Sequence, residues 1–408
     1  MDRTGTSPRN YRQQKTYPVM SKEDTKKVVP DVCSLIEHLL SEGIEKGASD
    51  IHFDPTAGGL TVKFRLDGSL HIVEHLPGAI QEYVITRLKV LGGLLTYRND
   101  IPQEGHIDWP SGQGAAGTVT DMRLAVFPTV RGQRAVVRLF YDNQDLNNLE
   151  TLGLPASILQ TLKNIASESQ GLLLLTGPAG SGKSTTLAAM IGTILQTTPG
   201  RSIVTLEDPV ERLIEGVSQI QIPPTGELTF STALRSLLRQ DPEVLMLGEI
   251  RDAQTAQIAA QAALTGHLLL STMHSGNCCA ALVRLLEMGI EPYQLTSSLL
   301  GIVNQRLLRR LCPECRQRGS DGTYQAVGCS CCAETGYRGR ILAAEMVEMD
   351  SSLRKAVLAR ADAEEISRLL QGRGCMNLLQ NAQRLIEEGL TTAEEVQRVC
   401  GRENPASS

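Results

Sequence analysis

The sequence predicts an α/β protein with three parts: a smaller α/β domain, a core built on a parallel sheet with helices on both faces, and a cysteine-rich segment followed by helices. Three observations predict this architecture. A strand, a glycine-rich loop and a helix follow one another between residues 171 and 195. Short apolar strands then alternate with helices to about residue 310, which is typical of a parallel sheet covered on both faces. Two C-x₂-C pairs lie between positions 312 and 332.

A tail, a small domain and a linker are predicted before the core. Residues 1–28 are polar and lack apolar periodicity, so we expect a flexible tail. Residues 29–141 combine helical apolar spacing with strand-like alternation and predict the smaller α/β domain. The polar, turn-prone stretch that follows predicts a linker over 142–152. Within the small domain, helices are expected over 32–44 and 81–91, and strands over 48–53, 60–66, 122–126 and 134–140.

The core is expected over residues 153–311. Its strands are short and apolar throughout, as in parallel sheets whose two faces are both buried. The predicted strands are 171–176, 203–206, 244–247 and 268–271, and the predicted helices are 155–166, 185–195, 232–240 and 253–264.

The glycine-rich loop reads GPAGSGKS and matches G-x-x-x-x-G-K-[ST] at every fixed position. Its glycines let backbone N–H groups turn toward phosphate oxygens, and the following helix adds the positive end of its dipole. The motif therefore predicts binding of a nucleoside triphosphate, with Lys183 at the β- and γ-phosphates and the Ser184 hydroxyl on Mg²⁺. A chance glycine-rich turn is disfavoured by the strand and the helix on either side.

Acidic residues follow two of the predicted core strands. Glu207 and Asp208 come after 203–206 and can orient Mg²⁺ or its waters, although an Asp-Pro sequence is also a common structural turn. Glu249 follows 244–247, one place beyond the position where such motifs usually carry an aspartate, and can polarise an attacking water. Ligands bind at the carboxyl ends of parallel strands, so these acids are expected beside the phosphate loop.

Two histidines bracket the predicted strand 268–271. An imidazole at His267 or His274 can contact a γ-phosphate and report its hydrolysis to the next helix. A lone histidine is more often structural, and it is the pair that favours a sensor role.

The cysteine pairs predict a zinc site over residues 312–345. Thiolates are soft ligands, and two C-x₂-C pairs suit tetrahedral Zn²⁺. Equal spacing selects Cys312, Cys315, Cys329 and Cys332, whereas Cys331 fits only with distortion. A closed set of four thiolates predicts a structural metal rather than a catalytic one. Free buried thiols are the alternative. The remaining residues, 346–408, are expected to be helical.

Composition limits the function classes further. Hydrophobic residues make up 41% and charged residues 21%, as in ordinary globular proteins. The net charge of −5 and the lack of a basic block argue against direct nucleic-acid binding. No apolar stretch approaches the length of a membrane span, and the amino terminus has no signal-peptide core. We therefore expect a cytoplasmic protein, docked at most peripherally on a membrane complex.

Together the motifs resemble the type II secretion and type IV pilus assembly ATPases, the GspE/PilB family. The resemblance extends from Ala48 to about Val399. Relatives without cysteine pairs are pilus-retraction ATPases, so the pairs point toward assembly or secretion. The matching segments are ASDIHF, FRLDGSL, DMRLAVFPTVRGQRAVVRLF, GPAGSGKST, TLEDPVE, LMLGEIRD, ALTGHLLLSTMH, CPEC, GCSCCAETGYRGR and EEGLTTAEEVQRV.

The resemblance implies a RecA-like phosphate-loop core after a PAS-like domain, and it assigns site residues in both. It makes Glu249 the catalytic glutamate, and it places Glu207 in an acidic box that assists Mg²⁺. Two arginines of the smaller domain match those that reach the γ-phosphate. The implied catalytic residues are Glu249, Lys183, Glu207, Arg123, Arg138, His267 and His274. The implied ATP-binding residues are Gly177, Pro178, Ala179, Gly180, Ser181, Gly182, Lys183, Ser184 and Thr185.

A function is implied as well. The family forms hexameric rings that hydrolyse ATP to power pilin or pseudopilin assembly from an inner-membrane platform. An ATPase for DNA uptake or conjugative transfer is the alternative. A non-hydrolysing scaffold is disfavoured because Lys183, Ser184 and Glu249 are all present.

Two departures from the family pattern stand out. Only about 30 residues precede the predicted small domain, 29–141, so the additional docking domain of many members is expected to be missing. His106 in IPQEGHI stands where an arginine is usual, which is expected to weaken nucleotide or inter-subunit contacts.

Overall fold

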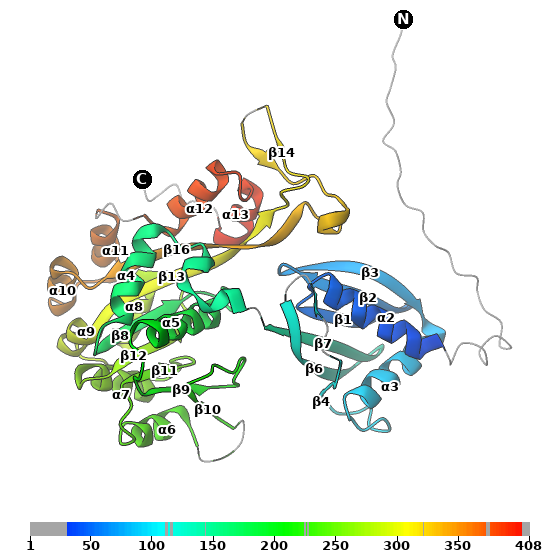
Figure 1. The fold of residues 1–408 in the computed structure, drawn as a ribbon, viewed down its shortest axis with the longest axis horizontal. Helices are drawn as coiled ribbons and strands as arrows, with labels where there is room; N and C mark the ends of the chain where they lie inside the picture. The colour runs from blue at the N-terminus through cyan, green and yellow to red at the C-terminus, as the bar shows by residue number, and fades with distance from the viewer. Residues whose placement is uncertain are drawn as a thin grey trace, which may run out of the picture.

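The computed structural model describes residues 31–110, 113–114, 117–142, 144–223, 226, 228–320, 322–372 and 376–401. They form two lobes, a smaller amino-terminal lobe and a larger one that contains the phosphate loop (Figure 1). The predicted tail, residues 1–28, lies outside the described residues.

The smaller lobe is an antiparallel sheet with strand order β3-β2-β1-β7-β6-β4, and β5 pairs with β6 at its side. Helices α2 and α3 cover one face, where Ile51 and Phe53 are fully buried. Alternate residues of a strand point to opposite faces, so Asp50 and His52 lie on the other face. The elements are α2 (Asp31–Glu45), β1 (Asp50–Thr56), β2 (Gly59–Leu66), β3 (Ser69–Pro77), the 3₁₀ helix η1 (Gly78–Ile80), α3 (Gln81–Leu91), β4 (Gln103–His106), β5 (Gln113–Gly114), β6 (Gly117–Thr129) and β7 (Gly132–Asp142).

Both helices and all four strands predicted for this lobe are present, and the structure adds β3 and β4. These two strands lie at the edges of the sheet and are half exposed. Their sequences therefore lack the strong apolar alternation that identifies a strand.

The predicted linker, 142–152, contains two short 3₁₀ helices, η2 (Gln144–Asn147) and η3 (Leu149–Leu152). Leu149 is fully buried in the same apolar cluster as Leu187 and Ile191 of the helix that follows the phosphate loop. Gly192 of that helix permits the close approach, because a Cβ there would lie 2.3 Å from the carbonyl oxygen of Asn147. Residues 147–152 are therefore packed against the larger lobe.

The larger lobe contains a sheet with strand order β10-β9-β11-β12-β8-β13-β16. All neighbours are parallel except β13 and β16, which are antiparallel. The α/β class and the parallel sheet are confirmed. The strands are β8 (Gly171–Thr176), β9 (Ile203–Glu207), β10 (Ser218–Gln221), β11 (Val244–Leu247), β12 (Leu268–Met273), β13 (Leu299–Leu311) and β16 (Tyr337–Glu348); β14 (Gln317–Arg318) and β15 (Tyr324–Gln325) pair separately.

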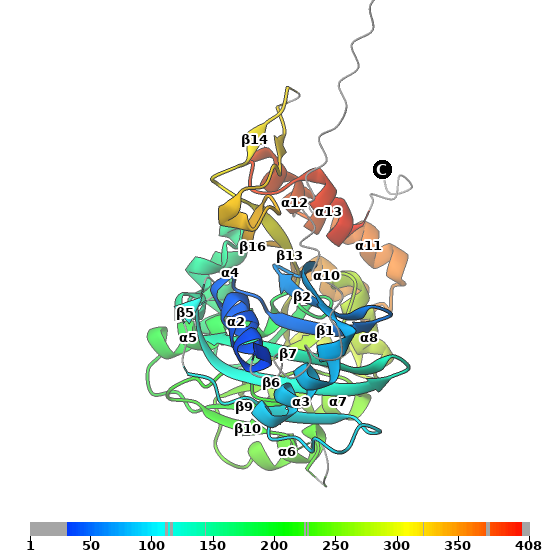
Figure 2. The same ribbon diagram turned by 90° about the vertical axis from the view of Figure 1, so that its right-hand side faces the viewer.

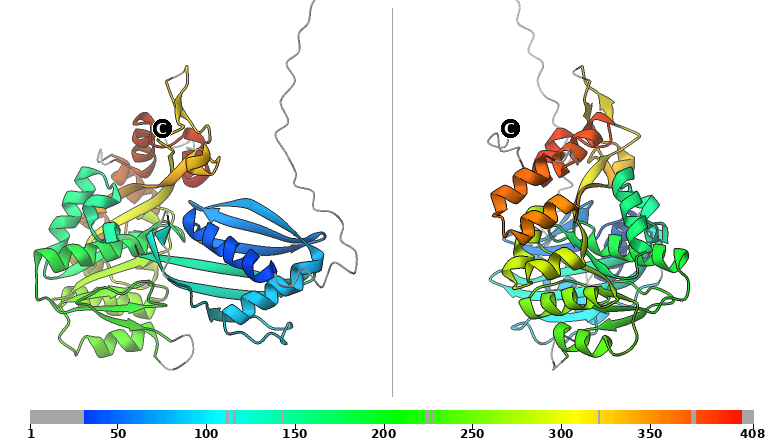
Figure 3. Two further views of the ribbon diagram at one scale, coloured as in Figure 1. Left: turned by 45° about the vertical axis from the view of Figure 1, so that its right-hand side comes forward. Right: turned by 90° about the vertical axis from the view of Figure 1, so that its left-hand side faces the viewer.

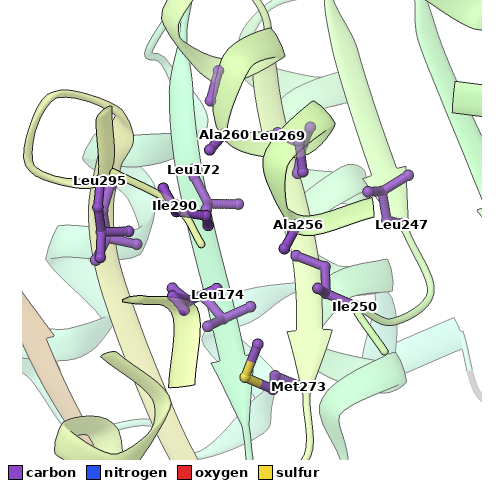
Figure 4. Close-up of a cluster of buried hydrophobic side chains, with 14 of the residues drawn as sticks. Leu172, Leu174, Leu247, Ile250, Ala256, Ala260, Leu269, Met273, Ile290 and Leu295 are labelled. Carbon is purple, nitrogen blue, oxygen red and sulfur yellow. The ribbon is translucent and has the colours of Figure 1, made fainter. Parts of the chain in front are cut away.

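Helices cover both faces of this sheet. Successive residues of a strand point to opposite faces, and both sets are buried. Leu173 and Leu175 of β8 face the helices before and after that strand, whereas Leu172 and Leu174 face the helices that come later in the chain (Figure 4). The helices are α4 (Ala156–Ala166), α5 (Lys183–Thr197), α6 (Phe230–Leu237), α7 (Ala253–Leu264), α8 (Cys278–Glu287), α9 (Pro292–Ser298), α10 (Ser351–Leu358), α11 (Ala363–Gln371), α12 (Leu378–Glu387) and α13 (Ala393–Cys400), with the 3₁₀ helix η4 (Ser330–Cys332).

The cysteine-rich segment leaves the core sheet and returns to it. It begins where β13 ends, projects as the β14–β15 hairpin and leads into β16 (Figure 2). Most of β16 therefore comes from the segment predicted as a zinc subdomain, 312–345. The last helices lie together at one side of the larger lobe (Figure 3). The backbone N–H of Gly339 in β16 donates to Asp67 of the smaller lobe, at 2.8 Å.

Helix α13 is fastened to β13 by a buried ion pair. Glu395 is fully buried and accepts hydrogen bonds from the Arg309 backbone N–H at 3.0 Å and from its Nε and Nη2 at 2.9 and 2.8 Å. Burial acts to raise the pKa of Glu395, but hydrogen bonds from Arg398 and Arg309 outweigh it and the pKa is lowered.

Glu395→Gln is expected to lower the free energy of unfolding by about 3–5 kcal/mol, because it leaves the Arg309 charge buried without its partner. The folded-state pKa is depressed, so this stabilisation is present above the unfolded-state pKa and is lost as pH falls through the folded-state value. Urea unfolding at neutral and acidic pH measures both effects. Glu388→Gln is the matched control, since exposed Glu388 pairs with Arg384 and should cost at most about 1 kcal/mol. Equal losses in the two variants would contradict the prediction.

Candidate active site

Eight of the predicted site residues line one cleft of about 400 Å³. The cleft lies where β8, β9, β11 and β12 end, which is the edge where parallel sheets bind ligands. Phe140 and Tyr141 of β7 also line it, so both lobes contribute to its walls. Among its other lining residues are Ala179, Gly180, Lys183, Ser184, Thr185, Glu207, Asp208, Gly248, Glu249, Thr272 and His274.

The phosphate loop between β8 and α5 depends on its glycines. Gly177, Gly180 and Gly182 have φ angles of 145°, 72° and 89°, in a region that other residues rarely adopt. Gly177 also permits close packing, because a Cβ there would lie 2.6 Å from both the Gln305 carbonyl oxygen and Ser181 Oγ. The loop is thus shaped by residue type as much as by packing.

Two side chains of the loop are arranged to meet an anion. Lys183 Nζ donates to the carbonyl oxygens of Gly177 and Pro178, at 2.8 and 2.9 Å. Burial lowers the pKa of Lys183, and the nearby Glu249 carboxylate acts in the opposite direction. An ammonium has three N–H groups, so one remains for a ligand. Ser181 Oγ is buried without a hydrogen-bond partner among the described residues, which is unusual for a buried hydroxyl. Both groups fit a bound phosphate.

Glu249 lies just beyond β11 and has two neighbouring side chains, Arg251 and His274. Its carboxylate pairs with Arg251 Nη2 and lies 3.7 Å from His274 Nε2. The hydrogen bond from Arg251 lowers the pKa of Glu249, against a smaller opposing effect of burial. Arg251 also reaches Asp208, with Nη1 at 3.4 Å from Oδ2. Arg251 was not singled out from the sequence, although its place two residues after Glu249 in the same motif was a usable signal.

Arg251→Ala is expected to move the acid limb of the pH–rate profile to higher pH. The Arg251 hydrogen bond depresses the pKa of Glu249, so its removal raises that pKa. Glu249, the catalytic residue that the sequence resemblance implies, is then protonated at a higher pH. The profile of kcat/KM for ATP hydrolysis measures this pKa in the free enzyme. Arg251→Lys, which keeps a positive charge, is the control and should shift the limb less. An unchanged profile in Arg251→Ala would show that the Arg251–Glu249 pair does not determine the pKa that limits the rate at acidic pH.

Glu207 is held at the end of β9 by two donors. Thr205 Oγ1 and Gln219 Nε2 donate to Glu207 Oε1, at 2.6 and 3.0 Å. Gln219 Nε2 also donates to the Arg212 carbonyl oxygen at 2.9 Å, so it fixes the loop that forms one wall of the cleft. No local pattern in the sequence marks Gln219, because only the parallel pairing of β10 with β9 brings it to Glu207.

The two predicted histidines lie at opposite ends of β12. His274 lines the cleft, whereas His267 precedes the strand and its Nδ1 lies 3.0 Å from the Ala262 carbonyl oxygen. Seven residues of nearly extended chain separate them by roughly 20 Å. The structure brings His274 to the cleft and does not bring His267 there.

Arg123 and Arg138 face each other across β6 and β7, on the sheet face opposite α2 and α3. Arg138 Nε donates to Asp50 at 2.9 Å, and Arg123 Nε donates to Asp121 at 3.0 Å. The Arg123 guanidinium also lies 4.7 Å from the ring centre of Phe140, which lines the cleft. Both arginines are therefore beside the cleft wall, and neither is among the lining residues.

His106 lies one strand farther from the cleft. It is opposite Arg123 in the β4–β6 pairing, and its Nδ1 is 3.2 Å from Asp121 Oδ1. The side chain is exposed and shares Asp121 with Arg123. The expectation that His106 weakens nucleotide or inter-subunit contacts stays a prediction.

The four predicted cysteines form one cluster. The Sγ atoms of Cys312, Cys315, Cys329 and Cys332 all lie within 4.8 Å of one another, and three of the separations are 3.7, 3.8 and 3.9 Å. A tetrahedral site with Zn–S bonds of about 2.3 Å requires separations of about 3.8 Å, so the cluster fits a zinc knuckle.

Backbone N–H groups donate hydrogen bonds to one of the four sulfur atoms. The N–H groups of Cys329 and Gly336 donate to Cys332 Sγ, both at 3.2 Å. Burial acts to raise the pKa of Cys332, but these donors bring it down to about 7, which favours the thiolate that binds metal. Cys331 is exposed and does not belong to the cluster, as the spacing predicted.

Comparison with known proteins identifies the family. The family model described as "Type II/IV secretion system protein" matches residues 25–398. The chain is 40% identical over 376 residues to the type II secretion system protein HxcR of Pseudomonas aeruginosa, covering 92% of this chain and 78% of that protein. It is 37% identical over 379 residues to the type IV pilus assembly ATPase PilB of Thermus thermophilus, covering 88% of this chain and 42% of PilB.

A solved structure agrees. The crystal structure of the pilus retraction motor PilT with bound ADP superposes with a TM-score of 0.63 and 26% identity, covering 91% of this chain and 98% of PilT. The family model spans more than half of the chain, and the motifs that suggested the resemblance all lie within the matched residues or at their edge. The chain therefore belongs to the type II/IV secretion system protein family, whose members among its relatives are secretion and pilus assembly ATPases.

Proposed function

We propose that this protein is an ATP-hydrolysing motor that powers assembly of pilin or pseudopilin subunits for type II secretion or pilus extension. One observation carries the proposal: a single cleft collects Lys183 and Ser184 of the phosphate loop, Glu249 of the next motif and residues of the smaller lobe. The names of the relatives supply the process, since they include type II secretion proteins and type IV pilus assembly ATPases.

Each group in the cleft has a proposed part in hydrolysis. Lys183 and the loop N–H groups bind the phosphates, and Glu249 accepts a proton from the attacking water. Ser184 would hold Mg²⁺, with Glu207 orienting its waters, and the ion would neutralise charge on the phosphates. His274 lies against Glu249 and is placed to respond when the γ-phosphate leaves.

A second cavity offers room for the rest of the nucleotide. It measures about 440 Å³ and adjoins the opposite side of the loop at Gly182 and Thr185. Apolar side chains there suit a base, and the basic side chains of Arg338 and Arg340 suit a ribose edge. The lining also includes the four leucines Leu146, Leu152, Leu307 and Leu342.

Motion between the lobes is the proposed output. Arg123 and Arg138 bond to Asp121 and Asp50 beside the cleft, and in this proposal they reach a γ-phosphate when the smaller lobe moves toward the larger one. Hydrolysis would release that contact. Six copies in a ring, the assembly that the sequence resemblance implies, would turn such movements into steps.

The proposed setting is the cytoplasmic side of an inner-membrane platform, with peripheral docking and no direct contact with nucleic acid. No helix within the described residues is both long and apolar enough to cross a bilayer. We propose that the cysteine cluster holds a structural Zn²⁺.

Phosphate release by the purified protein with Mg²⁺ and ATP tests the enzymatic part. Turnover is expected, and its complete absence under conditions where the protein assembles into rings would overturn the proposal. A parallel titration with duplex DNA at two salt concentrations tests the alternative of DNA transport. Tight, salt-sensitive binding would favour that alternative.

A further inference from the structure

We propose that Gln305 is a positioning residue that orients the phosphate loop, an inference that rests on the proposed nucleotide-binding function. Gln305 lies outside every motif that the sequence assigned to chemistry. It belongs to β13, which runs beside β8 with Asn304 opposite Thr176. Because β8 ends at Thr176 and β13 continues, the next residue of β13 lies level with the start of the loop.

The Gln305 side chain joins two parts of the loop region. It is fully buried, and its Nε2 donates to the Ser181 carbonyl oxygen at 2.9 Å. Its Oε1 accepts from Thr186 Oγ1, in the first turn of α5, at 3.2 Å. An amide side chain can donate to a carbonyl through its nitrogen and accept from a hydroxyl through its oxygen at the same time. A carboxylate of the same shape offers only acceptors to Ser181.

The bond to Ser181 has a consequence for the neighbouring peptide N–H. In a planar trans peptide the C=O and the following N–H point in opposite directions. Gln305 holds the Ser181 carbonyl toward β13, so the N–H of Gly182 is directed away from β13. Ala179, Gly180, Lys183 and Ser184 line the cleft, and we infer that an N–H directed away from β13 is available to a phosphate oxygen there.

The backbone of Gln305 is itself fixed. Arg306 Nη1 donates to the Gln305 carbonyl oxygen at 2.9 Å, and Arg306 Nη2 donates to the Gly276 carbonyl oxygen at 2.8 Å. Gly276 lies two residues beyond His274, so the same two residues of β13 contact the phosphate loop and the loop after β12. Gly177 packs close to the same residue, since a Cβ added there would lie 2.6 Å from the Gln305 carbonyl oxygen.

The test replaces Gln305 by methionine, which has a similar length and makes neither hydrogen bond, and by glutamate. Isothermal titration with ATP and steady-state hydrolysis are measured for each variant. Loss of the two bonds is expected to weaken ATP binding about 10- to 100-fold. KM should rise with kcat much less affected, because the loop binds phosphates in the ground state as well as in the transition state.

Asn381→Ala is the matched control for stability. Asn381 is another fully buried amide. It lies in α12, and its side-chain oxygen accepts from the Ala344 N–H of β16 rather than from the loop. This variant should lose thermal stability while its KM for ATP stays at the wild-type value. An equal rise of KM in Asn381→Ala and Gln305→Met would mean that Gln305 has only a structural role.

The outcomes separate this inference from the proposed function. If the wild-type protein neither binds nor hydrolyses ATP, the proposed function fails first. If the wild type binds ATP and Gln305→Met binds it equally well, only the positioning role is overturned. Should Gln305→Met fail to fold, Thr186→Val removes the other partner of the amide, and an unchanged KM in that variant would overturn the inference as well.

Discussion

Glu249→Gln is expected to slow ATP hydrolysis by about 10²–10⁴-fold while ATP binding stays close to the wild-type value. Glutamine keeps the shape of the side chain and can still accept the hydrogen bond from Arg251. It cannot accept a proton from the attacking water. Phosphate release measures the first effect, and equilibrium titration with ATP measures the second.

Lys183→Ala provides the contrast. It removes an ammonium that is held by the Gly177 and Pro178 carbonyl oxygens and faces the cleft, so both binding and hydrolysis should be lost. The two variants together separate chemistry from binding. Wild-type turnover by Glu249→Gln would exclude Glu249 as the base and would direct attention to Glu207, the other carboxylate at the cleft.

Loss of the zinc ion proposed at the cysteine cluster is expected to have the largest effect on stability. Apparent binding free energies of structural zinc sites are on the order of 10 kcal/mol, and much of that energy is folding energy. Here the cluster joins the end of β13 to the start of β16, and the Cys312 N–H donates to the Gly336 carbonyl oxygen at 2.9 Å. Without the metal, residues 312–336 should become susceptible to proteolysis and the docking of α13 should weaken.

Elemental analysis and limited proteolysis measure these effects. About one zinc per chain is expected in protein purified without chelators, and Cys329→Ser should lose it. Cys331→Ser is the control, because Cys331 is exposed and outside the cluster, and it should keep its metal. Absence of metal from the wild-type protein, or equal metal loss in both variants, would contradict the assignment.

Local patterns predicted a large part of the fold. The phosphate loop, its strand and its helix occupy one continuous stretch, and residue type and spacing along that stretch were enough to predict all three. The helices expected in residues 346–408 also begin where local chemistry favours it, because Asp362 and Thr392 cap the helices that follow them. The cysteine pairs were predictable for the same reason, since each pair is spaced by its own short turn.

Edge elements and long-range partners were not predictable in this way. The β13–β16 pairing joins residues on either side of the cysteine segment, and nothing in either strand alone specifies the other. No local pattern distinguishes Gln305 from other residues of the core. The order of the strands places it beside Ser181. The two histidines are close in sequence but not in space. His267 and His274 flank the same strand, and the strand holds them at its two ends, so that His274 alone of the pair reaches the cleft.

The sequence by itself determined the chemistry that is present: a phosphate loop, acids after neighbouring strands, four thiolates and arginines in a separate domain. Short-range spacing is enough for this, because each motif folds within a few residues of its own chain. Only the tertiary structure decided which of these groups meet. Sheet order and register brought Glu249 and His274 to Lys183, left His267 at the far end and set Arg123 and Arg138 beside the cleft. Such contacts join segments far apart along the chain, and they are fixed by the packing of the whole molecule.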